Sequence, residues 1–288
     1  MEKLLRLLAY AAAAAVLAGL ASLLGFLAWY GLPVLNAKLF FGDATFYDAV
    51  IKMRPVWNGI WPAFAGTLCL VLLTMLLALV PGVGCGIYLA RTGGRFAALL
   101  SAAVDLLASV PSIVMGLFGF VLILFLRRTL APHATTCIIL AAFCLALLVL
   151  PALVVTTRTS LESLPPSFER TGLALGFSEP QLLRHLLLPA AGRGILGGVM
   201  LAMGRAAEDT AVIMLTGVVV NSGLPAGLAA KFEALPFLIY YTAAQYADEN
   251  ELARGFGAAL VLLLLSGCLM GAAWAMQRGM EKRWRGVK

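Results

Sequence analysis

The sequence predicts an all-α integral membrane protein with six transmembrane helices and both termini in the cytoplasm. Hydrophobic residues make up 62% of the 288 residues and charged residues only 12%, about half the charged share of a soluble domain. Six apolar runs have about the 20 residues that a helix needs to cross a bilayer. Lysine and arginine gather in alternate segments between these runs. The runs cover residues 7–32, 63–90, 97–126, 134–157, 194–220 and 253–277.

The first run, residues 7–32, contains Ala-x-Ala triplets that resemble a signal-peptide cleavage site. The hydrophobic part of a signal peptide spans only about 7–15 residues, however, and this run is longer. We therefore expect an uncleaved first helix. The second run, 63–90, follows an outer loop and has the length of a complete span.

The third run, residues 97–126, contains the stretch "ASVPSIVMGLFGF". Pro111 cannot donate a backbone N–H, and Gly116 and Gly119 loosen the turns that follow it. The sequence predicts a kinked or broken helix here. The residues leave two interpretations open: an ordinary proline kink, or a break that lines a cavity at membrane depth.

The fourth and fifth runs are separated by the longest cytoplasmic segment, residues 158–194. We expect two short helices around a glycine turn. Ser167 is a candidate N-cap for the first, and Gly176 would end it. Pro180 would begin the second and Pro189 would end it. Such an amphipathic pair can lie on the membrane or dock to a soluble partner.

The fifth run contains three charges in the stretch "GRAAEDTAV". On one continuous helix, Arg205, Glu208 and Asp209 would share a face. Ionisable groups within a span usually mark a substrate or proton path; the alternative is an internal salt bridge that fixes helix packing. The trio sums to minus one when ionised, so an anion path needs a protonated acid or an arginine from a partner. Asp105 either caps a short helix or pairs with Arg205.

The net charge is +7, and its distribution sets the orientation. With the N-terminus inside, the cytoplasmic segments hold thirteen lysines and arginines and the outer segments seven, with Arg205 left within a span. Arg127 and Arg128 run against this bias. The positive-inside rule therefore supports two cytoplasmic termini, with a basic tail at 281–288.

Several kinds of chemistry are excluded. The chain has no P-loop motif, so it cannot bind ATP through one. His133 and His185 do not lie in a triad pattern, and the five cysteines suggest neither a disulfide framework nor a metal site. Energy for active transport would therefore come from another subunit or from an ion gradient.

The stretch "SFERTGLALGFSEPQLLRHLLLPAA" resembles the coupling loop of ABC importer permeases. In that family a pattern of Glu-Ala-Ala, glycine and then Ile-x-Leu-Pro forms the helix pair that docks to a cytoplasmic ATPase. The resemblance implies coupling roles for Glu169, Arg170, Gly176, Leu186, Leu188 and Pro189. The order Glu169-Arg170 is reversed from the family pattern. The coupling acid is therefore either Glu169, displaced by one residue or about 100° of helix rotation, or it is absent.

The stretches "VPSIVMGLFGF" and "GRAAEDTAVIMLTG" resemble the permeases of phosphate-specific importers, nearest the PstA type. This resemblance runs from about Gly66 to Gly267 and implies the type I ABC importer permease fold. It makes Arg205 the phosphate-interacting cation and Asp209 its acidic companion, although Glu208 stands where the family has glycine. The implied substrate pathway comprises Arg205, Glu208, Asp209, Thr210, Asp105 and Ser112.

The resemblance thus implies a non-catalytic permease subunit that moves inorganic phosphate inward by alternating access. We expect no cofactor on this chain, with ATP and Mg²⁺ on a partner ATPase. The alternatives are import of another oxyanion (molybdate, tungstate, sulfate or phosphonate) and, in another class, proton-coupled secondary transport through Glu208 and Asp209.

The expected partners are a second permease subunit (a PstC-type relative or a second copy), two ATPase subunits, and a periplasmic or lipid-anchored phosphate-binding protein. We expect contact with membrane lipid and none with nucleic acid, and a multi-pass location in the bacterial cytoplasmic membrane. We divide the chain into a first helix with its outer loop (1–62), a permease core (63–280) that includes the coupling segment 158–194, and the basic tail (281–288).

Overall fold

The computed structural model describes residues 1–52, 56–129 and 131–285, and side chains up to residue 279. Across these ranges the chain is helical, apart from loops and one isolated β-bridge between Val218 and Phe232. Six helical segments are long and apolar enough to cross a membrane, which confirms the predicted fold class. These segments are Glu2–Val34, Trp61–Arg91, Ser112–Thr129, Ile138–Glu162, Glu179–Glu208 and Glu249–Gly279.

The chain begins with a long helix, and three short helical elements lie between it and the second span. The structure does not describe residues 53–55, which come between η2 and α3. These first elements are α1 (Glu2–Gly31), η1 (Leu32–Val34), α2 (Ala37–Phe41), η2 (Tyr47–Ile51) and α3 (Trp61–Arg91).

The middle of the chain contains the third, fourth and fifth spans and the coupling segment between the fourth and fifth. The elements are α4 (Arg95–Ser109), α5 (Ser112–Thr129), α6 (Ile138–Glu162), α7 (Pro166–Ala174), α8 (Glu179–Leu182), the π-helical turn η3 (Leu183–Leu187), α9 (Leu188–Glu208) and α10 (Ala211–Thr216). The last two helices are α11 (Leu235–Gln245) and α12 (Glu249–Arg285).

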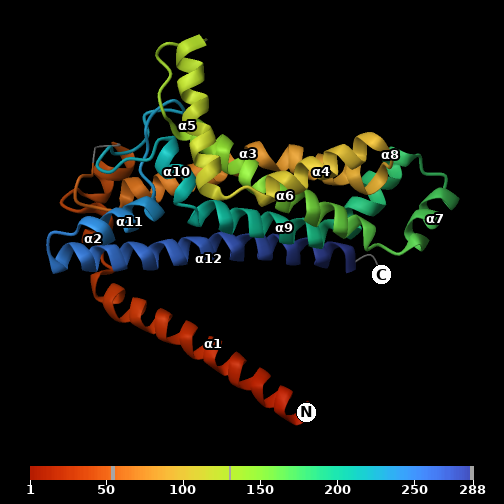
Figure 1. Cartoon of the computed structure of the whole chain (residues 1–288), viewed down its shortest axis with the longest axis horizontal. Helices are drawn as coiled ribbons and strands as arrows, with labels where there is room; N and C mark the ends of the chain where they lie inside the picture. The colour runs from red at the N-terminus through yellow and green to blue at the C-terminus, as the bar shows by residue number, and fades with distance from the viewer. Residues whose placement is uncertain (53–55, 130, 286–288) are drawn as a thin grey trace.

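The helices run mostly along one axis of the molecule (Figure 1). Helices α7 and α8 and the C-terminal end of α12 lie at one end, and α2 and α11 lie at the other. The positive-inside count places the α7–α8 end in the cytoplasm. Helix α5 departs from this arrangement, because it leaves the bundle at a steep angle to α4 (Figure 1).

Helix α6 is the centre of the packing. Its residues join the two largest apolar clusters, one shared with α5 and α10 and the other with α3 and α9. Helix α3 approaches α6 closely through glycines. A Cβ atom at Gly86 would lie 2.6 Å from Cβ of Thr157 and 2.8 Å from the backbone oxygen of Val154. Small residues allow such approaches in membranes, where van der Waals contact drives helix association.

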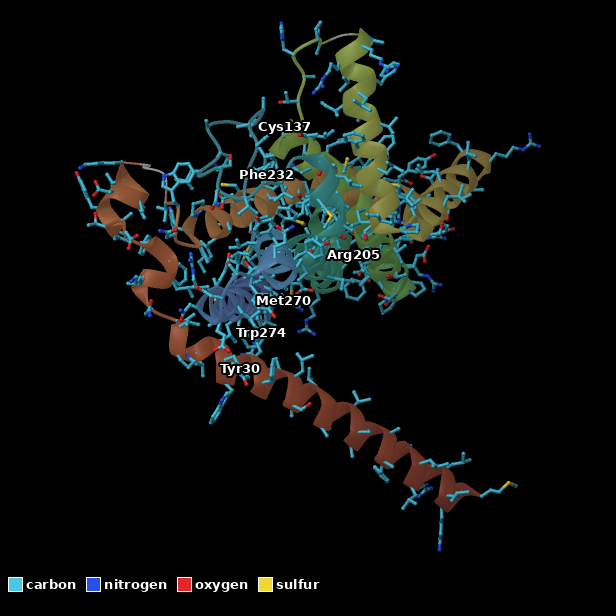
Figure 2. All side chains as sticks on the ribbon, turned by 60° about the vertical axis from the view of Figure 1, so that its left-hand side comes forward. Tyr30, Cys137, Arg205, Phe232, Met270 and Trp274 are labelled. Carbon is cyan, nitrogen blue, oxygen red and sulfur yellow. The ribbon has the colours of Figure 1, made fainter. Side chains whose placement is uncertain are left out.

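Helix α1 packs on the bundle only near its C-terminal end. The rings of Phe26 and Tyr30 lie 5.5 Å and 5.4 Å from that of Phe256 on α12, and Gly31 faces Leu260. Residues 1–26 are exposed in the isolated chain, and Figure 2 shows α1 diverging from the other helices beyond Tyr30. Lipid or another chain is therefore needed to cover most of this apolar helix.

The loop between α10 and α11 is held by a buried acid. Oε1 of Glu233 accepts hydrogen bonds from the backbone N–H groups of Ser222 at 2.8 Å and Gly223 at 2.6 Å. Burial raises the pKa of the Glu233 carboxyl, and these two hydrogen bonds offset part of the rise. Leu235, two residues after Glu233, donates its N–H to Oγ1 of Thr67 on α3 at 2.9 Å. The loop is thus fixed to the bundle.

Candidate functional site

The fifth span breaks at the charged stretch. Helix α9 ends at Glu208, and Asp209 has an extended backbone with φ −72° and ψ 118°. The Oδ1 atom of Asp209 accepts the N–H of Val212 at 2.8 Å, which satisfies a free donor at the start of α10. The expectation that Asp209 shares a helix face with Arg205 is therefore wrong. An aspartate side chain competes for nearby backbone donors and so favours a helix start over a helix interior.

Arg205 and Glu208 remain together on the last turn of α9, where both side chains are exposed. Neither makes a hydrogen bond or an ion pair with any residue that the structure describes. The alternative of an internal salt bridge that fixes helix packing is therefore wrong for this conformation. Thr210, which follows the break, is half-buried and its side chain makes no capping hydrogen bond. A guanidinium without an internal partner is available to a solute or to another chain.

The third span also breaks, as predicted. Helix α4 ends at Ser109 and α5 starts at Ser112, with Pro111 between them. Ser112 is half-buried at the first position of α5. Asp105 is exposed within α4, so it does not cap that helix, and it makes no contact with Arg205 in the described part of the chain. Both interpretations of Asp105 are wrong for this conformation.

The half-helices that follow the two breaks pack against each other. A Cβ atom at Gly116 of α5 would lie 2.9 Å from the backbone oxygen of Ala211 and 3.1 Å from Cα of Val212 on α10. A Cβ atom at Gly119 would lie 2.7 Å from Cγ2 of Thr216. The glycines of the "VPSIVMGLFGF" stretch therefore allow α5 to lie on α10. Paired discontinuous helices are a common setting for solute sites in transporters.

The coupling segment contains the predicted glycine turn. Gly176 has a φ of +80°. The N–H of Phe177 bonds to the oxygen of Gly172 at 3.1 Å and that of Gly176 to the oxygen of Leu173 at 3.0 Å, which is the Schellman arrangement at a helix end. The predicted N-cap is wrong, because α7 starts at Pro166 and includes Ser167. Proline is favoured at the first helical position, since its missing N–H needs no partner there.

The second half of the segment differs more from expectation. Pro180 lies in the first turn of α8, as predicted, and Ser178 forms a capping box with Gln181. Pro189 does not end the helix, because α8, η3 and α9 form one helical segment from Glu179 to Glu208. Pro189 lies in the first turn of α9, directly after the wider π turn. A π turn is a known way to admit a proline without ending a helix.

The coupling residues occupy different environments. Leu186, Leu188 and Pro189 are half-buried, and Arg170 is exposed. Glu169 forms an ion pair with Arg91 at the end of α3, with Nη1 of Arg91 2.6 Å from Oε1 of Glu169. No local sequence pattern points to Arg91, because only the fold brings together residues 78 positions apart.

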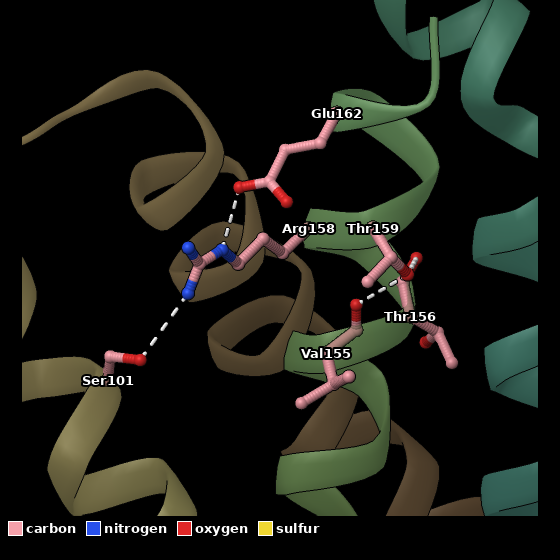
Figure 3. Close-up of polar contacts among 6 residues, drawn as sticks. All are labelled: Ser101, Val155, Thr156, Arg158, Thr159 and Glu162. Atoms are coloured by element: carbon pink, nitrogen blue, oxygen red, sulfur yellow. Dashed lines mark hydrogen bonds and ion pairs between the residues drawn. The ribbon is translucent and has the colours of Figure 1, made fainter.

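A second polar contact at the same end joins α4 to α6 (Figure 3). Arg158 donates from Nε to Oε1 of Glu162 at 2.8 Å and from Nη1 to Oγ of Ser101 at 3.3 Å. The first contact lies within α6 and the second crosses to α4. Helix α4, which precedes the break in the third span, is therefore also tied to the central helix α6.

Comparison with known proteins gives consistent results. The model of the family described as "Binding-protein-dependent transport system inner membrane component" matches residues 82–285. The chain is 33% identical over 241 residues to a Haemophilus influenzae protein named "Phosphate transport system permease protein PstA", with 82% of this chain and 79% of that protein covered. It is 27% identical over 236 residues to the "Probable phosphate transport system permease protein PstA" of Methanocaldococcus jannaschii, with the same two shares covered.

Among solved structures, a chain of the inward-facing MetNI methionine ABC transporter is similar to this one, with a TM-score of 0.56 and 18% sequence identity. The similarity covers 82% of this chain and 99% of that chain. At this identity the likeness concerns the fold alone.

Proposed function

The chain belongs to the family of inner-membrane components of binding-protein-dependent transport systems, and from this premise we propose that it is the permease subunit of an ATP-driven importer of inorganic phosphate. One observation carries the substrate: Arg205 lies at a helix break with no partner among the described residues, in a chain 33% identical to a protein named as a phosphate transport permease. A guanidinium presents parallel N–H donors that match two oxygens of a phosphate.

The mechanism we infer is alternating access. Arg205 lies near the far end of the helical segment that starts at Glu179 beside α7. With a rise of about 1.5 Å per residue, the 26 positions between Glu179 and Arg205 span about 40 Å. A displacement of the coupling segment would therefore move the Arg205 end of the same segment. The break at Asp209 allows α9 to move without carrying α10 with it.

Phosphate would bind Arg205 transiently, because a site that must release its solute cannot hold it tightly. Arg205 keeps its charge when water is removed. Glu208, exposed on the same helical turn, adds a negative charge that weakens anion binding and favours release. Asp209, Thr210 and Ser112 lie at the two breaks and would line the same path.

The partners we propose follow from this role. The isolated chain leaves Arg205 and most of α1 exposed, and a second permease subunit, either a PstC-type relative or another copy, would cover them. Two ATPase subunits would bind ATP and Mg²⁺ and dock on α7. A periplasmic or lipid-anchored binding protein would deliver phosphate at the α2–α11 end. The complex would lie in the bacterial cytoplasmic membrane.

Uptake of labelled phosphate tests the substrate assignment. Cells that lack this chain are complemented with the wild-type gene and assayed with excess unlabelled molybdate, sulfate or phosphonate. We expect restored uptake that only unlabelled phosphate suppresses. Suppression by another oxyanion would assign the importer to that anion instead. Uptake that needs no ATPase subunit and stops at once with a protonophore would favour a secondary transporter.

A further inference from the structure

The ion pair between Arg91 and Glu169 joins two parts of the chain that the sequence keeps apart. Arg91 is in the last turn of α3, and Glu169 is in the first turns of α7. Nη1 of Arg91 donates to Oε1 of Glu169 at 2.6 Å. By contrast, the ion pair between Arg158 and Glu162 lies within α6. The Arg91–Glu169 contact therefore reports how α7 sits on a membrane-spanning helix.

The helix ends favour this pairing. The C-terminal end of a helix carries partial negative charge and stabilises a cation such as Arg91, and the N-terminal end stabilises an anion such as Glu169. The side chains are 26% and 46% exposed, respectively. A pair with this much exposure to water contributes little to global stability. Its consequence is geometric, since a charge-assisted hydrogen bond fixes the position of one helix end against the other.

Two contacts with described residues link α7 to the membrane-spanning helices. Gly172 faces the side chains of Leu182 and Leu186, so α7 packs directly on the segment that continues into α9. Glu169, three residues before Gly172 and on the same face of α7, holds Arg91 of α3. Helices α3 and α9 both pack on the central helix α6. A force on α7 thus reaches two of the three central helices by separate routes.

We propose that Arg91 and Glu169 are positioning residues that transmit movement of α7 to α3, and that Glu169 serves this internal contact and not a contact with the ATPase. The inference rests on the proposed function, in which α7 is the docking helix. The inference also explains the reversed Glu169-Arg170 order: Glu169 makes the internal contact, and Arg170 is left to face a partner. Arg170 is exposed and makes no hydrogen bond or ion pair with described residues, so it is the charged group of α7 that faces a partner.

Charge reversal in the assembled transporter tests the link. The variants are Arg91→Glu, Glu169→Arg and the combination of both, each co-expressed with the partner permease and ATPase subunits. The readouts are co-purification of the ATPase, uptake of labelled phosphate, and backbone hydrogen exchange of residues 166–174. Each single reversal brings like charges together at a half-exposed site, and we expect about a fivefold loss of uptake and about fivefold faster exchange.

The combination restores the attraction with its polarity exchanged, so we expect uptake and exchange to return to within about twofold of wild type. The matched control is Glu162→Arg, which reverses an ion pair inside α6 whose side chains are 40% and 45% exposed. We expect this control to leave uptake and the exchange of residues 166–174 unchanged. Rescue by the combination separates a link between the two residues from a general loss of structure.

Two results would overturn the proposal. The first is a combined variant no better than the worse single variant while the ATPase still co-purifies. The second is loss of the ATPase with Glu169→Arg but not with Arg91→Glu, which would mean that Glu169 contacts the ATPase directly. If the wild-type complex takes up no phosphate, the proposed substrate is wrong, and the exchange pattern of residues 166–174 still decides whether the link exists.

Discussion

The contact between α3 and α6 offers a sharp test of the packing, because two glycines of α3 differ in their surroundings. A Cβ atom at Gly86 would lie 2.6 Å from Cβ of Thr157 and 2.8 Å from the backbone oxygen of Val154, whereas a Cβ at Gly84 would meet nothing within 4 Å. Thr157 is fully buried, and a backbone oxygen cannot rotate away. Carbon contacts are optimal at about 3.5–4.0 Å, so Gly86→Ala requires α3 and α6 to separate.

The cost follows from this overpacking, which is typically about 1–3 kcal/mol. Replacing glycine with alanine in a helix also gains about 0.5–1 kcal/mol, but Gly84→Ala in the same helix receives the same gain. The difference between the two variants therefore isolates the packing. We expect Gly86→Ala to have a free energy of unfolding about 1–3 kcal/mol lower than that of Gly84→Ala.

The assay is unfolding of the purified chain in mixed micelles by titration with dodecyl sulfate, followed by tryptophan fluorescence. The two variants are compared with each other and with the wild-type protein. Equal midpoints for Gly86→Ala and Gly84→Ala, or a higher midpoint for Gly86→Ala, would refute the close approach of α3 to α6.

Three further predictions concern the helix ends and the buried acid. Asp209→Ala removes the acceptor for the Val212 N–H and should destabilise the chain by about 1 kcal/mol, measured in the same titration, whereas Asp209→Asn should retain most of the stability. Gly176→Ala places a Cβ at a φ of +80° and should cost about 1 kcal/mol; hydrogen exchange of residues 166–174 that stays as slow as in wild type would contradict the turn. The raised pKa of Glu233 means that the folded state holds a proton more tightly than the unfolded state. The loop at 218–233 should therefore lose stability as the pH rises from the ordinary value of 4.5 through the raised pKa. Glu233→Gln should remove this dependence in hydrogen exchange corrected for intrinsic rates, and an unchanged dependence would assign it to another group.

Much of the fold could be predicted from the sequence, because length and apolarity decide which segments span a membrane. All six predicted runs contain or overlap a span of the structure. Pro111 predicted the break in the third span, since proline removes a donor whatever its surroundings. The resemblance to ABC importer permeases of the PstA type is confirmed by the family match and by the relatives.

The predictions that were wrong or missing concern interactions that compete with the helical pattern or form only in the folded chain. The periodicity of "GRAAEDTAV" fits a continuous helix, but the Asp209 side chain bonds to the Val212 N–H and starts a new helix. Pro189 looked like a helix end, but the π turn at 183–187 admits it. The Arg91–Glu169 pair could not be predicted at all, because it exists only once α3 and α7 are packed together.

The central claim is that phosphate binds Arg205 on its path through the membrane, and uptake by arginine variants tests it most directly. Arg205→Ala, Arg205→Lys and wild type are compared in cells that lack the native chain, with co-purification of the ATPase as the measure of assembly. Arg128→Ala is the matched control, because Arg128 is also exposed but lies at the far end of α5.

A hydrogen bond to a charged group contributes about 1.5–3 kcal/mol, so losing it should reduce phosphate uptake by about tenfold or more. We therefore predict normal assembly and at least about a tenfold loss of uptake with Arg205→Ala, partial activity with Arg205→Lys, and full activity with Arg128→Ala. Phosphate uptake by Arg205→Ala at the wild-type rate would contradict the account.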